Sequence, residues 1–304
     1  MITGVLNVAK PRGLTSHDVV VRVRRLSGER RIGHAGTLDP IATGVLLMCL
    51  GQATRIAEYL ADAPKSYLAA IRLGAVTPTW DAETEPVETA DVSGLTAEQI
   101  NRVLTRFVGP IMQQPPMYSA LKHDGQPLYK LARKGITVVQ EPRLVEIGAL
   151  KLVRWEPPYL VARIDCSKGT YVRSLAHDLG EALGVGAYLA ELERTAVGPF
   201  HSTDAVPLTT LQEERQDGRW KEHLLPLYDA LAHWPHAIVD DETRQRLCYG
   251  QAVAIDVPVD ANLCFAYDSA HELIAVLRPG VRAGQWQPHK VFLATSPGAQ
   301  TSVP

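Results

Sequence analysis

The most reactive candidate in the sequence is Asp39, which lies in a glycine-rich segment spanning residues 31–44. Glycines at this density are typical of a loop with unusual backbone dihedrals or a close approach to another group. Pro40 pushes the backbone of Asp39 toward extended geometry, and the apolar run 45–50 that follows predicts a buried strand. A carboxylate held in this way could act as a nucleophile. The same residues also fit an aspartate that only caps a turn, and composition alone leaves both interpretations open.

Two further side chains could work with Asp39. Residues 65–73 alternate in polarity, which predicts a strand with Tyr67 on its apolar face, either as a core aromatic or as a stacking platform. Arg173 lies in the first turn of a helix predicted over residues 171–183, where a positive charge opposes the helix dipole. A carboxylate partner would offset that cost. Asp39 is one candidate partner, and an acidic residue on the surface is the alternative.

Four strings around these residues resemble the motifs of the TruB family, the tRNA pseudouridine-55 synthases. They are K-P-x-G-x-T-S at residues 10–16, G-H-A-G-T-L-D-P-x-A-T-G at 33–44, K-x-Y at 65–67 and C-S-K-G-T-Y-V-R at 166–173. The chain departs from the family pattern in one place. Where the family usually has consecutive arginines before T-x-V-G, this chain has Glu193-Arg194, so one RNA contact or salt bridge is expected to differ.

The resemblance implies an activity and a role for each candidate. Asp39 would be the nucleophile, attacking either C1′ of the ribose or C6 of the uracil, and Arg173 would pair with it and keep it ionised. Tyr67 would stack on a flipped-out uridine and is a candidate for taking the proton from C5. The residues expected to bind the substrate are His34, Tyr67, Tyr171 and Leu192. The isomerisation has no redox step, so neither a cofactor nor a metal is expected.

The elements that must position these residues indicate an α+β protein. Predicted strands cover residues 5–8, 45–50, 65–73 and 161–166, and predicted helices begin with Ser16 as N-cap, at Gln52, near Ala97 and at Tyr171. The resemblance implies the pseudouridine-synthase fold, with a mixed, mainly antiparallel central sheet, flanking helices and an active-site cleft.

Three further segments complete the predicted organisation. Residues 110–142, inside a catalytic domain at 1–234, resemble the family's thumb-like RNA-binding insertion, where aromatic residues alternate with basic ones. Strands predicted at 251–255, 262–267, 272–277 and 290–294 indicate a small, mainly β module over 235–296. Its position resembles the family's PUA-type RNA-binding domain. Residues 297–304 are predicted to be a disordered tail.

Composition narrows the class of protein. The 304 residues are 46% hydrophobic and 21% charged, which is typical of a soluble globular protein. We see neither a transmembrane run nor a secretory signal, and four scattered cysteines argue against a zinc site or disulfides, so a cytoplasmic protein is expected.

Residues 1–135 hold 16 Lys and Arg against 12 Asp and Glu, whereas residues 136–304 hold 15 against 21. A basic first half could meet phosphates, although chance asymmetry also fits. The expected partner is the T-arm of tRNA, bound by a monomer that needs no protein partner and no membrane.

Other classes of function fit the sequence less well than a pseudouridine synthase. A glycoside hydrolase would need two working carboxylates, and the glycine-rich loop supplies one. A P-loop enzyme needs the string G-x-x-x-x-G-K-[ST], which is absent. A non-catalytic RNA-binding protein is the serious alternative, although Asp39, Tyr67 and Arg173 together argue against pure binding. A related synthase that acts under a guide RNA is a second alternative, made less attractive by the lack of long lysine-rich tails.

Overall fold

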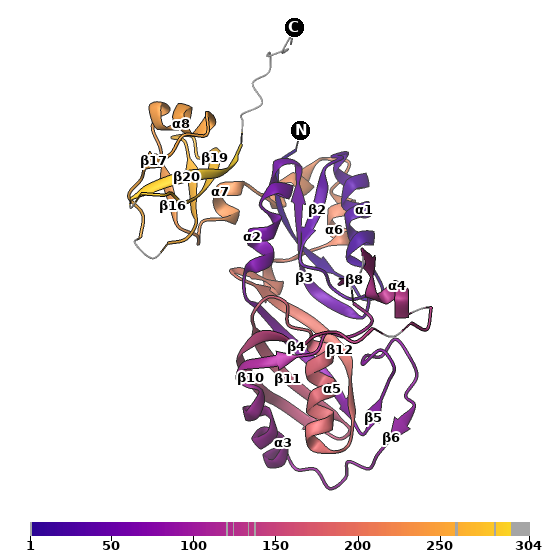
Figure 1. The fold of residues 1–304 in the computed structure, drawn as a ribbon. Coiled ribbons are helices and arrows are strands. Elements are labelled where there is room, and N and C mark those ends of the chain that lie inside the picture. The colour runs from indigo at the N-terminus through magenta and orange to yellow at the C-terminus, as the bar shows by residue number, and fades with distance from the viewer. Residues whose placement is uncertain are drawn as a thin grey trace.

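The computed structural model of the chain describes residues 2–292, apart from 120, 124, 133, 137, 259, 260 and 283. The predicted tail at 297–304 therefore lies outside the described residues. An 11-stranded sheet runs through most of the molecule (Figure 1), and its main path has the order β14-β1-β3-β12-β4-β11-β10-β7. These strands are β1 (Gly4–Lys10), β3 (Ala42–Leu50), β4 (Lys65–Leu73), β7 (Gly109–Gln113), β10 (Arg143–Glu156), β11 (Tyr159–Cys166), β12 (Ala187–Val197) and β14 (Val206–Pro207).

The sheet is mixed and mainly antiparallel, as predicted. On the main path only β1 with β14 and β12 with β3 are parallel pairs. Three short strands extend it, namely β2 (Ile32–Ala35) on β3, β13 (Phe200–His201) on β12 and β15 (Leu224–Leu225) on β1. This arrangement confirms the predicted α+β class.

Strand β3 is buried on both faces, which explains its continuous apolar run. Leu46 and Met48 pack into a core shared with α1 (Ser16–Ser27), α3 (Ala97–Leu104) and α5 (Val172–Leu183). Leu47 and Cys49 point the other way, into a second core with α2 (Ala57–Asp62). A strand covered by helices on both faces has no polar side to alternate with. Strand β4, by contrast, alternates in burial along its length, so the strand predicted over 65–73 is confirmed with both its ends.

The insertion leaves the sheet after β7 and returns at β10, its neighbour in the sheet. Its regular elements among the described residues are the two-residue strands β8 (Lys122–His123) and β9 (Gln126–Pro127) and the helix α4 (Leu128–Ala132). A second excursion after β4 carries β5 (Ala75–Val76) and β6 (Glu88–Thr89). The chain leaves the sheet through α6 (Leu208–Glu213) and α7 (Leu227–Ala230).

The C-terminal module is a five-stranded sheet with the order β16-β18-β19-β20-β17. Its elements are β16 (His236–Ile238), α8 (Asp241–Cys248), β17 (Val253–Ala254), β18 (Cys264–Tyr267), β19 (Leu273–Pro279) and β20 (Gln285–Val291). The module packs against α2: the rings of Phe265 and Tyr59 meet edge to face at 5.5 Å. Nearby, Arg55 Nη1 donates to the carbonyl of Val291 at 2.8 Å.

Several predicted boundaries were wrong. The N-cap of α1 is Thr15, whose hydroxyl accepts from the amide of Asp18 at 3.1 Å, and Ser16 makes other contacts described below. The helix predicted from Gln52 is split into a 3₁₀ turn, η1 (Gly51–Arg55), and α2. The strand predicted at 290–294 begins earlier, at Gln285, and residues 293–294 lie outside the described part. Among the described residues, no helix is long and apolar enough to cross a membrane.

Candidate active site

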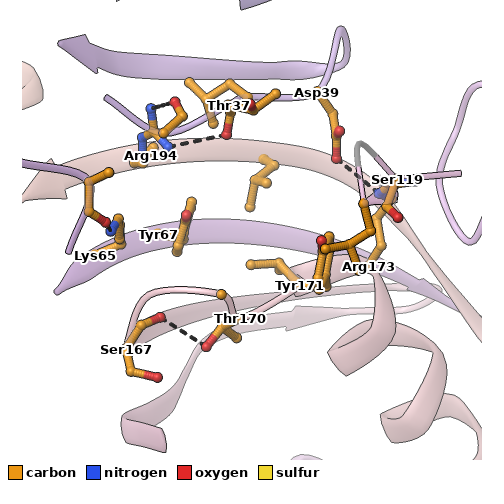
Figure 2. Close-up of a pocket in the computed structure, with 17 residues that line it drawn as sticks. Thr37, Asp39, Lys65, Tyr67, Ser119, Ser167, Thr170, Tyr171, Arg173 and Arg194 are labelled. Atoms are coloured by element: carbon orange, nitrogen blue, oxygen red, sulfur yellow. Dashed lines mark hydrogen bonds and ion pairs between the residues drawn. The ribbon is translucent and has the colours of Figure 1, made fainter. Parts of the chain in front are cut away.

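A cavity of about 360 Å³ opens where the glycine-rich loop, β4, β12 and the start of α5 meet. Five of the six residues predicted for the site line it, namely Asp39, Tyr67, Tyr171, Arg173 and Leu192. Figure 2 shows Asp39 and Arg173 at one end of the cavity and Tyr67 on the strand that forms its floor. A cavity of this size falls in the range of small-ligand sites and is lined by both apolar and polar groups, which suits a nucleoside.

Asp39 and Arg173 form the ion pair that the helix-dipole argument suggested. Arg173 Nε lies 2.9 Å from Asp39 Oδ2, and the side chains are 5% and 34% exposed. A buried guanidinium needs compensating partners because burial of an unpaired charge is costly. The more open carboxylate remains accessible from the cavity, so it can meet a substrate while Arg173 stays behind it.

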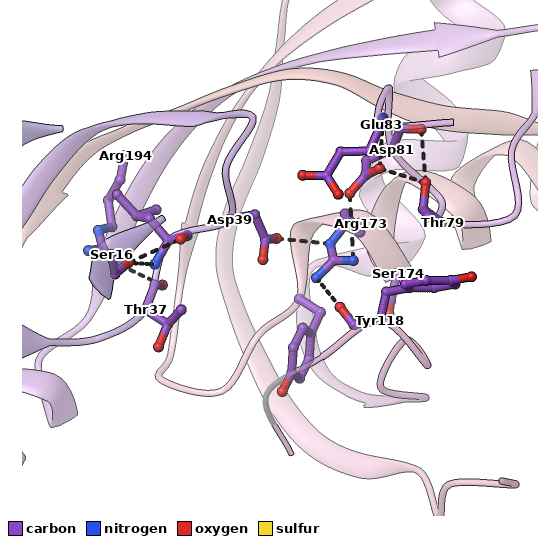
Figure 3. A network of polar contacts seen from close by, with 12 residues as sticks. Ser16, Thr37, Asp39, Thr79, Asp81, Glu83, Tyr118, Arg173, Ser174 and Arg194 are labelled. Carbon is purple, nitrogen blue, oxygen red and sulfur yellow. Dashed lines mark hydrogen bonds and ion pairs between the residues drawn. The ribbon is translucent and has the colours of Figure 1, made fainter. Parts of the chain in front are cut away.

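Arg173 has two further partners, shown in Figure 3. Its Nη1 lies 3.6 Å from Asp81 Oδ2, and its Nη2 donates to the carbonyl of Tyr118 at 2.9 Å. Asp81 is itself held by the hydroxyl of Thr79, which donates to Asp81 Oδ1 at 2.6 Å. The guanidinium is therefore fixed by three groups from three separate segments, and no sequence pattern indicated the two partners beyond Asp39.

The pKa of Asp39 moves in the direction opposite to the one expected. Burial raises the pKa of the Asp39 carboxyl above its ordinary value, and the charge of Asp81 adds to the rise. The charge and hydrogen bond of Arg173 lower it, but they offset only part of the effect of burial. The expectation that Arg173 favours the ionised form is correct for Arg173 alone, while the net shift is upward.

The loop around Asp39 is held by side chains that lie outside the cavity. Lys10 Nζ donates to the carbonyls of Ala42 at 2.5 Å and Pro40 at 3.4 Å. The hydroxyl of Ser16 accepts from the amide of Leu38 at 2.8 Å and donates to its carbonyl at 3.1 Å. Together these contacts fix the backbone on both sides of Asp39, which is what a rigid nucleophile requires.

Arg194 is a site residue that the sequence reasoning missed. It is 1% exposed, its Nε donates to the carbonyl of Val45 at 2.7 Å, and its Nη2 donates to that of Gly36 at 3.1 Å. Its strand passes so close to the loop that a Cβ at Gly44 would overlap the carbonyl oxygen of Arg194, which explains that glycine. Lys10, 1% exposed, was missed as well. Lys10 lies in the K-P-x-G-x-T-S string, and Arg194 lies where the chain departs from the family pattern. These two strings were the sequence features that could have identified them.

Tyr67 lies in the wall of the cavity with 8% of its surface exposed. Burial raises the pKa of its hydroxyl, and the neighbouring Arg194 guanidinium acts in the opposite direction. The ring is thus both a core aromatic and a cavity residue, so the two interpretations of Tyr67 do not exclude each other. Tyr171 and Leu192 line the same space.

His34 is the predicted site residue that the structure does not bring to the cavity. It is half-buried on β2, and it is not among the residues that line the pocket. Burial lowers the pKa of its imidazole, with help from the nearby charge of Arg194. Among the described residues there is also no group of three or more His, Cys, Asp or Glu side chains that could hold a metal ion.

The arrangement can now be compared with known proteins. The family model of the TruB pseudouridylate synthase N-terminal domain matches residues 24–172. The model of the tRNA pseudouridylate synthase B C-terminal domain matches residues 173–232. A tRNA pseudouridine synthase B of Dehalococcoides mccartyi is 43% identical over 97% of this chain and 98% of its own length. The chain belongs to the TruB family.

Other TruB relatives extend the comparison. A tRNA pseudouridine synthase B of Symbiobacterium thermophilum is 50% identical over 84% of both chains. Among solved structures, a chain of a Cbf5-Nop10-Gar1 complex is similar with a TM-score of 0.75 and 26% identity, covering 95% of this chain and 85% of that one. The membership makes this chain an RNA-modifying isomerase, a tRNA pseudouridine synthase with the TruB architecture.

Proposed function

We propose that this TruB protein isomerises uridine 55, in the T-arm loop of tRNA, with Asp39 as the nucleophile. The observation that carries the proposal is the buried Arg173 guanidinium, 2.9 Å from a carboxylate that is still one-third exposed at the end of a nucleoside-sized cavity. Because the exposed part of this carboxylate lies at the cavity, Asp39 is available to a substrate while it stays paired with Arg173.

The chemistry follows from these positions. The N1–C1′ bond breaks, the uracil turns and C5 joins C1′. C5 loses its proton and N1 gains one, so the product is an isomer of the substrate. Asp39 attacks C1′ or C6 and is released at the end. Because a base inside a stack cannot reach the cavity, the uridine must flip out. Tyr67 supports the flipped base with its ring, and Tyr171 and Leu192 enclose it.

The remaining expectations belong to the same proposal. The protein acts as a cytoplasmic monomer on the T-arm stem-loop, without a protein partner, and the insertion at 110–142 clamps the RNA. The module at 235–296 acts as a PUA-like RNA-binding domain. His34 contacts RNA outside the cavity, since it lies on β2 next to the loop that carries Asp39.

The test is incubation of the purified protein alone with an unmodified T-arm stem-loop, followed by mapping of pseudouridine. We expect conversion at position 55 and none in a stem-loop with cytidine there. Asp39→Asn, which keeps the shape of the side chain, should bind the RNA and lower turnover by on the order of 10⁴-fold or more. Activity that requires an added guide RNA or protein, or near-normal turnover by Asp39→Asn, would refute the proposal.

A further inference from the structure

The root of the insertion, defined as residues 113–119, is bonded directly to the first turn of α5. Gln113 Nε2 donates to the carbonyl of Tyr171 at 3.0 Å, and the amide of Tyr171 donates to Gln113 Oε1 at 2.7 Å. The hydroxyl of Ser174 donates to the carbonyl of Gln114 at 2.7 Å. Arg173, between these two, donates to the carbonyl of Tyr118. The segment that leads to the RNA-binding insertion and the turn that carries Arg173 are therefore one hydrogen-bonded unit.

Within the root of the insertion, Gln113 is the residue that belongs to a strand. It is the last residue of β7, it pairs with Arg143 of β10, and it is 1% exposed. Helix α5 begins at Tyr171 without a capping side chain of its own. Gln113 supplies the missing acceptor from across the fold, so the start of α5 is anchored to the edge of the central sheet.

The consequence for Asp39 follows from distance along the helix. Arg173 is two residues beyond Tyr171, so any displacement of the first turn moves the guanidinium relative to Asp39. We propose that Gln113 is a positioning residue, which ties the root of the insertion to the first turn of α5 and thereby holds Arg173 against Asp39.

The ionisable groups around Asp39 make this role measurable. Three charged groups from separate segments act on the Asp39 carboxyl, namely Arg173, Asp81 and Lys10. The hydroxyls of Tyr67 and Tyr171 are also close by. Arg173 is the strongest of the groups that lower the pKa of Asp39. A looser Arg173 would raise that pKa, so the rate would begin to fall at a higher pH on the acid side.

The inference rests on the proposed function, and its test uses single-turnover kinetics on the T-arm stem-loop as a function of pH. Gln113→Met keeps the size of the side chain and removes both hydrogen bonds to Tyr171. Ser174→Ala removes only the bond to Gln114 and serves as a milder second variant. The matched control is Asn7→Leu, because Asn7 is also buried and donates to a carbonyl, that of His201 at 2.9 Å, away from the cavity.

We expect Gln113→Met to lower the single-turnover rate about 10- to 100-fold, since small misplacements of a catalytic group have effects of this size. RNA affinity should stay within a few-fold of wild type, and the acid limb of the pH–rate profile should move to higher pH. Ser174→Ala should change the single-turnover rate and the acid limb in the same directions, by smaller amounts. Melting temperatures measured for all three variants identify a loss of folded protein.

These measurements distinguish a failure of the inference from a failure of the proposed function. If wild type modifies the stem-loop and Gln113→Met has the rate and pH profile of Asn7→Leu, Gln113 has only a structural role and the inference is overturned. If Gln113→Met does not fold, an unchanged pH profile in Ser174→Ala overturns it instead. If wild type itself leaves uridine 55 unmodified, the proposed function fails.

Discussion

Arg173 meets Asp39 through Nε and not through the two terminal nitrogens of its guanidinium. The Nε–Oδ2 distance is 2.9 Å, while Nη1 faces Asp81 and Nη2 donates to the carbonyl of Tyr118. All three sides of the planar group are thus in use. A planar group with several fixed donors suits such a site, whereas an ammonium is a point charge.

Arg173→Lys is the variant that separates charge from geometry. It keeps the positive charge but cannot reach three partners at once, so we expect a fall in single-turnover rate of at least about 100-fold with little change in RNA affinity. Quenched-flow assays on the T-arm stem-loop measure the rate, and filter binding measures the affinity. A lysine variant with near wild-type rate would show that charge alone suffices.

The pH dependence of the reaction should report Asp39. Burial raises the pKa of Asp39, and the proposed nucleophile is its ionised form. The rate should therefore fall as the pH drops through a value above the ordinary carboxyl pKa of about 4. Removing the opposing cation in Arg173→Met should move this inflection to higher pH. Removing the second carboxylate in Asp81→Asn should move it to lower pH. Shifts in the same direction for both variants would contradict the assignment of the acid limb to Asp39.

Tyr67 can act by stacking, by proton transfer, or by both. Tyr67→Phe keeps the ring and removes the hydroxyl, whereas Tyr67→Leu removes both. Loss of a general base typically costs about 100- to 10,000-fold in rate, and loss of stacking about 1–3 kcal/mol in binding. We expect Phe to bind RNA normally and to stall after glycosidic cleavage, and Leu to bind poorly. Single-turnover kinetics on RNA with 5-deuterated uridine test this, and a fast Phe variant would leave Tyr67 with stacking alone.

A basic cluster at the end of α1 and on the loop beyond it should contact RNA phosphates. Its members are Arg22, Arg24, Arg25, Arg30 and Arg31, and none of them has an ion pair with another described residue. Arg102 on α3, by contrast, pairs with Glu98 at 3.2 Å. Arg22→Glu with Arg25→Glu should weaken RNA binding and reduce its salt dependence, because fewer counterions are released.

The control for that cluster is Arg102→Glu, which changes surface charge equally per site on α3. Binding is measured by titration between low and high salt. An Arg22→Glu, Arg25→Glu variant with the affinity and salt slope of the control would show that the cluster is only a solvated helix face.

The C-terminal module should add RNA affinity without taking part in the chemistry, but it cannot simply be cut off. Phe265 and Phe292 share a buried core with Tyr59 and Ala53. A chain ending at residue 234 would expose this core, so we expect a lower melting temperature for the truncated protein. Its folded fraction should still modify a T-arm stem-loop and bind full-length tRNA more weakly. Calorimetry and activity at low temperature separate the two effects; complete inactivity of a folded truncation would contradict the division of roles.

Much of the site was predictable from local sequence. The strand over 65–73 follows from a period of two, and the end of α1 follows from Gly28, which adopts the left-handed conformation with φ of 69°. Asp39, Tyr67 and Arg173 were found because they lie in strings with a recognisable pattern. The position of Arg173 in the first turn of a helix indicated an acidic partner, and the family resemblance singled out Asp39 as that partner.

Only the tertiary structure decided what holds these residues and how their pKa values move. Arg194 and Lys10 bind backbone carbonyls of the loop, and no local pattern predicts which carbonyl a distant side chain will reach. The pKa of Asp39 depends on burial and on Asp81, which are properties of the packed molecule. His34 was placed in the site by its motif and lies outside the cavity, because nearness in sequence does not determine which way a strand residue faces. The sequence alone thus determined the reactive groups and their elements, whereas the contacts that fix and tune them arise only when separate segments meet.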